Sequence, residues 1–365
     1  MVNFVFFVLK VYPLEQTQYK VIGVMSGTSL DGIDLVCVNF TIGASWSYSF
    51  LATQTVAYSS AWQSRLAALM VSSEEEIQEV NDRYTDLLAE TIQKFIYDKQ
   101  LGALDAVCSH GHTLFHEPEK GLTFQLGNQK KLAKRLGLKV VCDFRVQDVA
   151  LGGQGAPLVP IGDLLLFGAY DACLNLGGFA NGSKTISKSI IAYDICAVNT
   201  VLNFLAQKKG YAYDPQGSMA AQGSLVKPFY ESLEKLDYYT KRTPKSLGME
   251  WVKTTLFPLI ENHKNEALED LLYTYTLHIA NQIVAQFETG QKVLATGGGV
   301  KNTFLMKLIK QNSNAVFTIP NEDLIDFKEA LIFGLLGVLR LRGQVNCLSS
   351  VTGATQDHSS GKIYY

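Results

Sequence analysis

The sequence lacks several signatures that would assign a function directly. It contains neither a Walker P-loop nor the spaced glycines of a dinucleotide-binding fingerprint, which argues against P-loop kinases and Rossmann dehydrogenases. It has no nucleophile elbow of the serine-hydrolase type, and no CxxC, HExxH or zinc-finger spacing. A basic stripe with interleaved aromatic residues is also absent, so we do not expect nucleic acid as a partner.

The chain has 365 residues, of which 47% are apolar and 18% are charged, and its formal net charge is −2. This length exceeds the size at which one hydrophobic core stops growing, so we expect two lobes. The composition is typical of a well-packed α/β protein. Most cysteines lie in apolar, strand-like runs, which favours reduced thiols and a cytoplasmic location over disulfides or a zinc site. The six are Cys37, Cys108, Cys142, Cys173, Cys196 and Cys347.

Eight of the first nine residues are apolar, but Lys10 interrupts the run early. No basic segment precedes this run and no small-residue cleavage site follows it, so we do not expect a signal peptide. The run is also too short to span a bilayer, so we do not expect a membrane partner. We expect an extra edge strand here, or a start codon placed too far upstream.

The most informative segment is residues 20–38, KVIGVMSGTSLDGIDLVCV, in which a polar turn separates two apolar strands. The turn at residues 26–29 has backbone N–H groups that large side chains do not cover, so it can wrap a phosphate. Asp31 and Asp34 follow, where they can hold a magnesium ion through water. An ordinary hairpin turn of Gly, Ser and Asp has the same pattern.

Several further segments consist of a short apolar strand that runs into glycine or a polar residue, among them DAVCSHGHT, KVVCDFRVQD, DACLNLGGFAN and KVLATGGGVKN. Helical patterns separate them, which predicts α/β layers with active loops at the strand ends. A strand–hairpin–loop unit occurs twice, beginning at Val21 and at Ala172, which indicates two related lobes. We expect residues 1–143 and 345–365 to form the first lobe and residues 144–344 the second.

Two glycine turns follow apolar strands in the second half of the chain. Residues 297–299 are a triple glycine ahead of a helical pattern that begins at Thr303, where a helix N-terminus can receive a flat or anionic ligand. Gly177 and Gly178 form the other turn. A purely structural glycine turn remains an alternative for the triple glycine.

Two acids lie at the ends of predicted strands. Asp194 ends the strand 190–194, where a carboxylate is well placed to act as a general base, although it can instead cap the helix expected at 199–205. Asp143 and Arg145 follow another strand, and Arg145 can grip a carboxylate or phosphate with two hydrogen bonds. An internal ion pair between Asp143 and Arg145 would leave the same pattern.

Three of the six histidines crowd into residues 109–118, SHGHTLFHEP. Imidazole and carboxylate groups suit zinc, but this spacing matches neither HExxH nor a zinc finger. We therefore expect histidines that line a polar ligand pocket through hydrogen bonds rather than a metal centre.

Taken in order, SGTSLDGID, SHGHTLFHEP, FQLGN, DFRVQDVALGGQGAPLVP, NLGGFAN, Asp194, TGGGVKN and FKEALIFGLLG closely resemble the anhydro-N-acetylmuramic acid kinase family. The resemblance covers Val21 to the C-terminus. This family belongs to the actin/hexokinase/Hsp70-type ATPase superfamily, so the resemblance implies a two-lobed, ribonuclease H-like α/β fold with ATP and sugar in a cleft between the lobes. It also accounts for the missing Walker motif, because this superfamily binds phosphates with hairpin turns.

The reaction of the family uses ATP and water to open the 1,6-anhydro ring of 1,6-anhydro-N-acetylmuramic acid and to phosphorylate O6, in the recycling of peptidoglycan. The resemblance implies that Asp194 is the general base for the water that attacks C1, and that Glu329 orients the sugar or the water. It also implies a homodimer. Two alternatives stay open, namely a kinase for another sugar and a nucleotide-binding protein that has lost catalysis.

The resemblance assigns binding residues as well. The turn at residues 27–34 would hold the β- and γ-phosphates and Mg2+, the glycines at 297–299 would flank the adenosine, and Arg145 would meet the lactyl carboxylate or the pyranose oxygens. The cofactor set is Gly27, Thr28, Ser29, Asp31, Gly32, Asp34, Gly177, Gly178, Gly297, Gly298, Gly299 and Asn302, with Asp31 and Asp34 for the metal. The substrate set is His112, Gln125, Asp143 and Arg145.

One segment departs from the family pattern. Family members carry Asp-Thr-Gly-Pro, a small residue and Asn after the base, whereas residues 194–199 of this chain are DICAVN. The spacing of Asp and Asn is kept, but a hydroxyl and a flexible glycine are missing from the second phosphate turn. We expect an altered ATP affinity or turnover, and we expect Cys196 to be a buried, small apolar residue.

Overall fold

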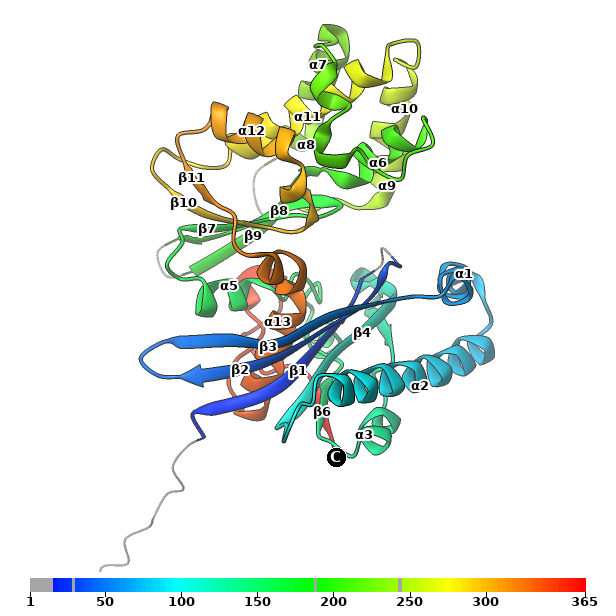
Figure 1. The fold of residues 1–365 in the computed structure, drawn as a ribbon, viewed down its shortest axis with the longest axis vertical. Helices are drawn as coiled ribbons and strands as arrows, with labels where there is room; N and C mark the ends of the chain where they lie inside the picture. Colours follow the sequence, from blue (N-terminus) through cyan, green and yellow to red (C-terminus); the bar gives the residue numbers. More distant parts are fainter. Residues whose placement is uncertain (1–15, 28–29, 187–188, 242–244) are drawn as a thin grey trace, which may run out of the picture.

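The computed structural model describes residues 16–27, 30–186, 189–241 and 245–365. The strand expected near the N-terminus and the turn residues Thr28 and Ser29 therefore lie outside the described residues. Two β-sheets with helices packed on them form the described part of the chain (Figure 1), which confirms the predicted α/β class. Among the described residues, no helix combines the length and the apolar character needed to cross a membrane.

The first sheet has the strand order β12-β6-β4-β1-β2-β3, with β5 paired to β4. The strands β1, β2 and β3 are antiparallel neighbours, whereas β4 and β6 continue on the other side of β1 in parallel. Their bounds are β1 (Gln18–Ser26), β2 (Gly32–Ile42), β3 (Trp46–Ala57), β4 (Ala106–Glu117), β5 (Leu122–Leu126), β6 (Val140–Cys142) and β12 (Lys362–Tyr364).

The second sheet repeats this arrangement in the order β11-β10-β7-β8-β9. Again the first three strands are antiparallel neighbours, and two parallel strands continue on the other side of the first one. The repeated unit predicted from Val21 and Ala172 is thus present in both sheets. The bounds are β7 (Ala172–Leu176), β8 (Phe179–Ile186), β9 (Ser189–Ala197), β10 (Lys292–Thr296) and β11 (Val316–Thr318).

Fourteen described α-helices connect and cover the sheets. They are α1 (Ser60–Ala68), α2 (Glu74–Asp98), α3 (Lys130–Leu136), α4 (Val146–Ala150), α5 (Pro160–Leu166), α6 (Asn199–Gln207), α7 (Lys227–Glu234), α8 (Asp237–Thr240), α9 (Met249–Trp251), α10 (Phe257–Glu261), α11 (Leu268–Val284), α12 (Thr303–Asn312), α13 (Glu322–Leu341) and α14 (Ser349–Thr352). Shorter 3-10 or π turns are η1 (Leu69–Val71), η2 (Pro118–Lys120), η3 (Pro215–Gly217), η4 (Ala220–Gln222), η5 (Val252–Leu256) and η6 (Gly298–Lys301).

The helix α13 packs against β1, β2 and β4 of the first sheet and also contacts β10 of the second (Figure 1). Between Leu324 and Leu339, every residue except Asp326 and Glu329 is buried. The contact with β1 is close enough to require glycine, because a Cβ at Gly23 would lie 2.0 Å from the carbonyl oxygen of Ala330. The helix therefore has a fixed position, with its two accessible acids on one face. The predicted boundaries of the two lobes stay a prediction.

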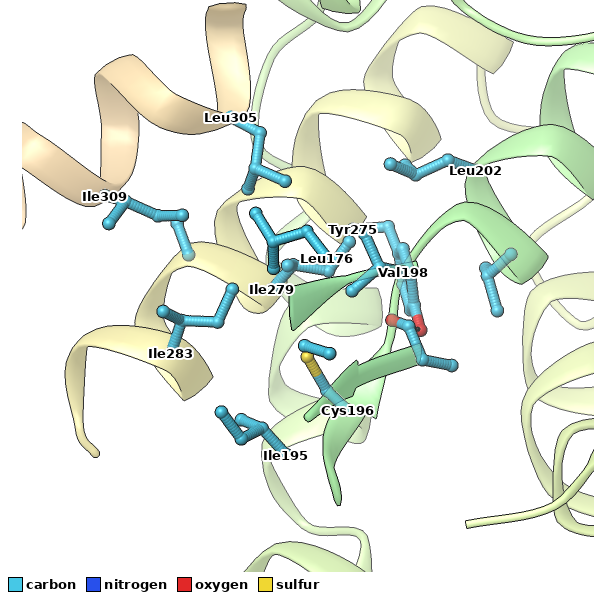
Figure 2. Packing of buried hydrophobic residues seen from close by; sticks show 14 of the residues in the cluster. Leu176, Ile195, Cys196, Val198, Leu202, Tyr275, Ile279, Ile283, Leu305 and Ile309 are labelled. Atoms are coloured by element: carbon cyan, nitrogen blue, oxygen red, sulfur yellow. Dashed lines mark hydrogen bonds between the residues drawn. The ribbon is translucent and has the colours of Figure 1, made fainter. Parts of the chain in front are cut away.

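Alternating side chains of the strands contribute to three hydrophobic cores. In β10, Val293 and Ala295 face the core beneath α6, α11 and α12, whereas Leu294 faces the core around α13. Figure 2 shows the first of these cores, including Cys196, which is fully buried there as expected. The α13 core also contains residues of the first sheet, such as Val21. Both sheets thus share one central layer.

All six cysteines are buried and none forms a disulfide, in agreement with the expectation of buried thiols.

Candidate active site

The hairpin turn between β1 and β2 is closed by a backbone hydrogen bond from Leu30 N to Gly27 O, at 3.4 Å. A carboxylate oxygen of Asp31 accepts a hydrogen bond from Gly32 N at 2.9 Å. Gly32 is needed here, because a Cβ would lie 2.5 Å from the carbonyl oxygen of Val56 in β3. The described residues on either side of the turn predicted for phosphate binding thus lie on or next to paired strands.

Asp34 is the residue whose pKa is raised by burial and by the neighbouring acidic side chains of the site. Its carboxylate accepts a hydrogen bond from Thr55 Oγ1 at 2.5 Å. Burial raises its pKa to about 6, the Thr55 bond opposes this, and repulsion from Asp31, Glu329 and Asp326 raises the pKa further. The negative charges of Asp31 and Glu329, and of Asp326 to the extent that Lys301 leaves it uncompensated, thus act on Asp34 and favour a cation beside it.

Glu329 joins this acidic region to Arg145. Its side chain keeps contact with solvent, yet the surrounding protein raises its pKa by partial removal from water, while Arg145 and Lys328 oppose the rise. Burial also lowers the pKa of Arg145 to about 10, and Glu329 is the leading charge that counters this effect. The structure thus brings together Asp34, Glu329 and Arg145, three residues that the sequence assigned to one site.

Arg145 is held by two hydrogen bonds that fix its guanidinium. Nε donates to His110 Nε2 at 2.8 Å, and Nη1 donates to the carbonyl oxygen of Gly155 at 2.7 Å. The group also lies over the ring of Phe333 in α13, with Cζ 6.0 Å from the ring centre. Among the described residues, Nη2 has no hydrogen-bond partner, so it remains available for a ligand.

The alternative of an ion pair between Asp143 and Arg145 is wrong. Asp143 Oδ2 instead lies 2.6 Å from Lys362 Nζ of β12. The sequence could not predict this pair, because the two residues become neighbours only when β12 adds to the first sheet beside β6.

His110 and His112 face opposite sides of the first sheet. Two residues apart in a regular strand they would share a face, but Gly111 between them has a φ of +75°, which breaks the alternation. The ring of His110 packs against Phe333 of α13, with centroids 4.6 Å apart, whereas the ring of His112 packs near Tyr84 of α2. His110, one of the three clustered histidines but not a member of the expected substrate set, is thus the histidine that contacts Arg145.

The protonation of His110 follows from its two partners. Nδ1 donates to the carbonyl oxygen of Gly111 at 2.8 Å, so Nε2 is free to accept from Arg145. Burial, with a smaller contribution from Arg145, lowers the pKa of His110 well below its usual range. The ring is therefore neutral, and its role is to orient Arg145.

His112 belongs to a buried chain of hydrogen bonds beneath the hairpin turn. The hydroxyl groups of Tyr84 and Tyr58 are 2.6 Å apart, Tyr58 and Ser26 are 2.6 Å apart, and Ser26 Oγ lies 3.0 Å from His112 Nδ1. Burial lowers the pKa of His112 to about 4. The chain anchors Ser26, the residue directly before the turn. It could not be predicted, because its members come from four separate segments.

Gln125 is buried in β5, and its Nε2 donates to Thr123 Oγ1 at 2.8 Å. Its Oε1 has no hydrogen-bond partner among the described residues. Buried polar atoms are normally paired, so this oxygen is a candidate for a ligand contact.

The glycine turn after β7 closes onto the start of α6. The carbonyl oxygen of Gly178 accepts from Val198 N at 2.8 Å and from Thr200 N at 3.2 Å, and that of Gly177 accepts from Asn199 N at 3.3 Å. The altered segment at residues 194–199 thus still forms a turn with Gly177 and Gly178.

The three glycines after β10 have different structural roles. A Cβ at Gly297, whose φ is +82°, would lie 2.5 Å from Asn175 Oδ1, and one at Gly299 would lie 2.7 Å from Leu176 Cβ. Gly298 has no such neighbour within 4 Å. The outer glycines therefore permit close packing on β7, while Gly298 borders open space.

That open space is a pocket of about 400 Å³, a size that suits a nucleoside. Lys301 at its edge pairs with Asp326 of α13, at 2.6 and 2.7 Å. Asn302 caps α12 by accepting from Leu305 N at 3.0 Å. The lining residues are Asn199, Leu202, Asn203, Tyr213, Asp214, Pro215, Gln216, Gly298, Lys301 and Asn302.

Asp194 lies within β9 rather than at its end, because the strand continues to Ala197 across a bulge opposite Ala180 and Asn181. The predicted strand end was therefore wrong, and so was the alternative of a helix cap, since α6 has no side-chain cap. Asp194 Oδ2 accepts from Leu247 N at 2.8 Å. Burial raises the pKa of Asp194, and this bond opposes the rise.

The backbone of Asp194 is held as well, since its carbonyl oxygen accepts from the Tyr238 hydroxyl at 2.6 Å. Among the described residues, no contact joins Asp194 to Asp34, Arg145 or Glu329. The candidate site thus consists of two halves: one contains Asp34, Arg145 and Glu329, and the other contains Asp194.

Two sheets with the same mixed strand order, each with a hairpin turn, define the class of protein. It is a two-sheet α/β protein in which both sheets have the ribonuclease H-like strand order. Residues 19–365 match the family described as anhydro-N-acetylmuramic acid kinase. The chain belongs to the anhydro-N-acetylmuramic acid kinase family.

Relatives cover nearly the whole chain. An anhydro-N-acetylmuramic acid kinase from Aliivibrio fischeri is 33% identical over 365 residues, which covers 94% of this chain and 99% of that protein. One from Sulfurimonas denitrificans is 32% identical over 368 residues, with coverage of 94% and 98%. Among solved structures, component A of (R)-2-hydroxyglutaryl-CoA dehydratase from Acidaminococcus fermentans has a TM-score of 0.45 and 10% identity, with coverage of 87% and 97%.

The buried hydroxyl chain can be tested with Tyr58→Phe. Removing its central hydroxyl leaves two buried polar groups without that partner, so we expect a loss of about 1–3 kcal/mol in the free energy of unfolding. Chemical denaturation measures this loss. Tyr48→Phe is the matched control, because the Tyr48 hydroxyl has no hydrogen-bond partner among the described residues. Equal stabilities of the two variants would contradict the role of the chain.

Proposed function

We propose that this protein is an ATP-dependent kinase that hydrolyses the 1,6-anhydro ring of 1,6-anhydro-N-acetylmuramic acid and phosphorylates O6. The product would be N-acetylmuramic acid 6-phosphate, formed in the cytoplasm during peptidoglycan recycling. The observation that carries this proposal is the family match over residues 19–365, which spans both halves of the site. The resemblance also supports a homodimer.

Asp31 and Asp34 would hold Mg2+ beside the hairpin turn. The donor set fits this ion, because magnesium binds through a few carboxylates and water, and the mutual repulsion of the acids around Asp34 favours a cation. When bound, it would neutralise charge on the β- and γ-phosphates. The adenosine would occupy the pocket at Gly298, with Gly177 and Gly178 nearer the phosphates.

Arg145 would bind the lactyl carboxylate of the sugar. His110 supports this role by holding Nε, while Nη2 stays available. Gln125 Oε1, a buried acceptor without a partner among the described residues, would accept a hydrogen bond from a sugar hydroxyl or amide. Glu329, close to both Arg145 and Asp34, would orient the sugar or the attacking water.

Asp194 would act as the general base. It would take a proton from the water whose oxygen bonds to C1, the C1–O6 bond would break, and O6 would take the γ-phosphoryl group. Burial raises the pKa of Asp194 toward the working pH, which favours a base that both accepts and releases a proton. Because its described contacts lie within the second half of the site, the reaction requires the lobes to close around the sugar.

The alternative of lost catalysis is not favoured. The altered segment at residues 194–199 still donates backbone hydrogen bonds to Gly177 and Gly178, and it keeps Asp194 and Asn199. The missing threonine and glycine change side chains in this turn without opening it.

The proposal is tested by incubating the protein with ATP, Mg2+ and 1,6-anhydro-N-acetylmuramic acid in O-18 water. Mass spectrometry should find a product that carries both a phosphate and one heavy oxygen at C1. A phosphorylated product without the heavy oxygen would contradict coupled hydrolysis. A better acceptor among other sugars would contradict the proposed substrate.

Asp194→Asn should lower kcat by several orders of magnitude while leaving the fold intact, because the amide cannot take the proton. Steady-state kinetics measure this effect, and circular dichroism verifies the fold. Asp237→Asn, on an exposed position of the same lobe, is the control. Near-normal turnover in Asp194→Asn would exclude the residue as the base.

The raised pKa of Asp34 predicts a pH dependence of nucleotide binding. Below about 6, this carboxyl group carries a proton that a metal–nucleotide complex must displace. Affinity for magnesium and a non-hydrolysable ATP analogue should therefore fall by up to about tenfold per unit as the pH drops below this value. Calorimetry between about pH 5 and about pH 8 measures it. Asp34→Asn should bind more weakly and with a flatter pH profile, whereas Asp98→Asn should match the wild type.

A further inference from the structure

A second group of metal-ligating side chains lies outside the candidate active site. Asp148, Cys347 and His358 each offer one ligand atom, and these atoms all lie within 4.8 Å of one another. The three residues are only 0%, 1% and 6% exposed, respectively. Asp148 belongs to α4, while the other two form an isolated β-bridge near the C-terminus.

Hydrogen bonds determine which ring nitrogen of His358 carries a proton. Its Nδ1 lies 3.1 Å from the carbonyl oxygen of Gln356, which can only accept, so Nδ1 carries the proton. In the neutral ring, Nε2 is then a bare acceptor, and it has no hydrogen-bond partner among the described residues. It lies 3.6 Å from Asp148 Oδ1. Asp148 Oδ1 accepts hydrogen bonds from the Cys347 thiol and the Thr352 hydroxyl, whereas the buried Nε2 is left unpaired, so a cation bound here would replace the thiol proton and also satisfy Nε2.

Cys347 and the distances indicate which cation this is. Cys347 Sγ lies 3.0 Å from Asp148 Oδ1, the same oxygen that His358 faces. A tetrahedral zinc ion with sulfur, nitrogen and oxygen ligands separates each pair of ligand atoms by roughly 3.3–3.6 Å. Because the three ligand atoms here lie within 4.8 Å of one another, the side chains would draw together when the ion binds. A proton on His358 would pair the histidine with Asp148 and leave the Cys347 thiol as a hydrogen-bond donor to Asp148 Oδ1, so metal loading distinguishes the two states.

We propose that Asp148, Cys347 and His358 bind a divalent cation of the zinc class. Binding would release the thiol proton of Cys347 to solvent, and a metal–sulfur bond would take its place. One carboxylate, one thiolate, a neutral imidazole and a divalent ion sum to zero charge, which suits a buried site. A small oxygen ligand, such as water or the Thr352 hydroxyl that bonds to Asp148 Oδ1 at 2.7 Å, would complete the four ligands.

The metal would cross-link the C-terminal segment to the loop that supports Arg145. Asp148 Oδ2 accepts from Gly155 N at 2.7 Å, and the carbonyl oxygen of Gly155 accepts from Arg145 Nη1. The bond from Cys347 to Asp148 spans 199 positions in the sequence. This separation explains why no zinc spacing marks the site in the sequence.

The test uses the full chain, unfolded with a chelator and reductant and then refolded with Zn2+ or Co2+. After desalting, about one zinc ion per chain should remain. The cobalt form should show the near-ultraviolet absorption of a thiolate–cobalt bond and the intense visible bands of four-coordinate cobalt. A wild-type chain that retains no metal, or a cobalt form without the thiolate band, would overturn the proposal. This readout needs neither a variant nor kinase activity, so it is independent of the proposed function.

Variants locate the ion. Cys347→Ser and His358→Gln should each weaken zinc binding by at least about 100-fold, as measured by competition with a chromophoric chelator. Cys37→Ser, in an equally buried position of β2, should bind as the wild type does. Asp34→Asn should also retain the ion, which separates this site from the proposed magnesium site. Unchanged binding in Cys347→Ser would exclude the thiol as a ligand.

Discussion

The buried ion pair between Lys328 of α13 and Asp163 of α5 joins the two halves of the molecule. Their charged atoms are 2.7 Å apart, with side chains only 6% and 7% exposed, and Asp163 also accepts from Ser183 of β8 at 2.5 Å. Removing one partner of such a pair leaves a buried charge, at a cost of about 3–5 kcal/mol. The pair therefore fixes the rotation of α13 within the layer that both sheets share.

The rotation of α13 about its axis determines which of its side chains reach the candidate active site. With Lys328 turned inward, Asp326 and Glu329 lie together on the accessible face, three residues apart. Glu329 extends toward Arg145 and Asp34, while Asp326 pairs with Lys301 at the nucleoside-sized pocket. One helix thus relates the acids around Asp34, the guanidinium of Arg145 and the pocket at Gly298, although these groups belong to different parts of the fold.

Structural features that depend on a local pattern of residues could be predicted from the sequence. Apolar strands that run into glycine predicted both sheets and the hairpin turn, and the order of the motifs predicted the family. Contacts between segments far apart in the chain could not be predicted from the sequence. The partner of Asp143 is Lys362, and the support of Arg145 is His110. The extension of β9 past Asp194 was missed because pairing with β8, rather than the composition of DICAVN, keeps that segment extended.

Gly111 has a consequence for how this protein can evolve. Its left-handed backbone lets one strand send His110 to the arginine and His112 to the hydroxyl chain, and a Cβ at this position would lie 2.4 Å from the carbonyl oxygen of Leu126. The support of Arg145 and the anchoring of Ser26 therefore depend on one backbone conformation. A lineage can vary either histidine separately, but replacing the glycine would disturb both sets of contacts at once.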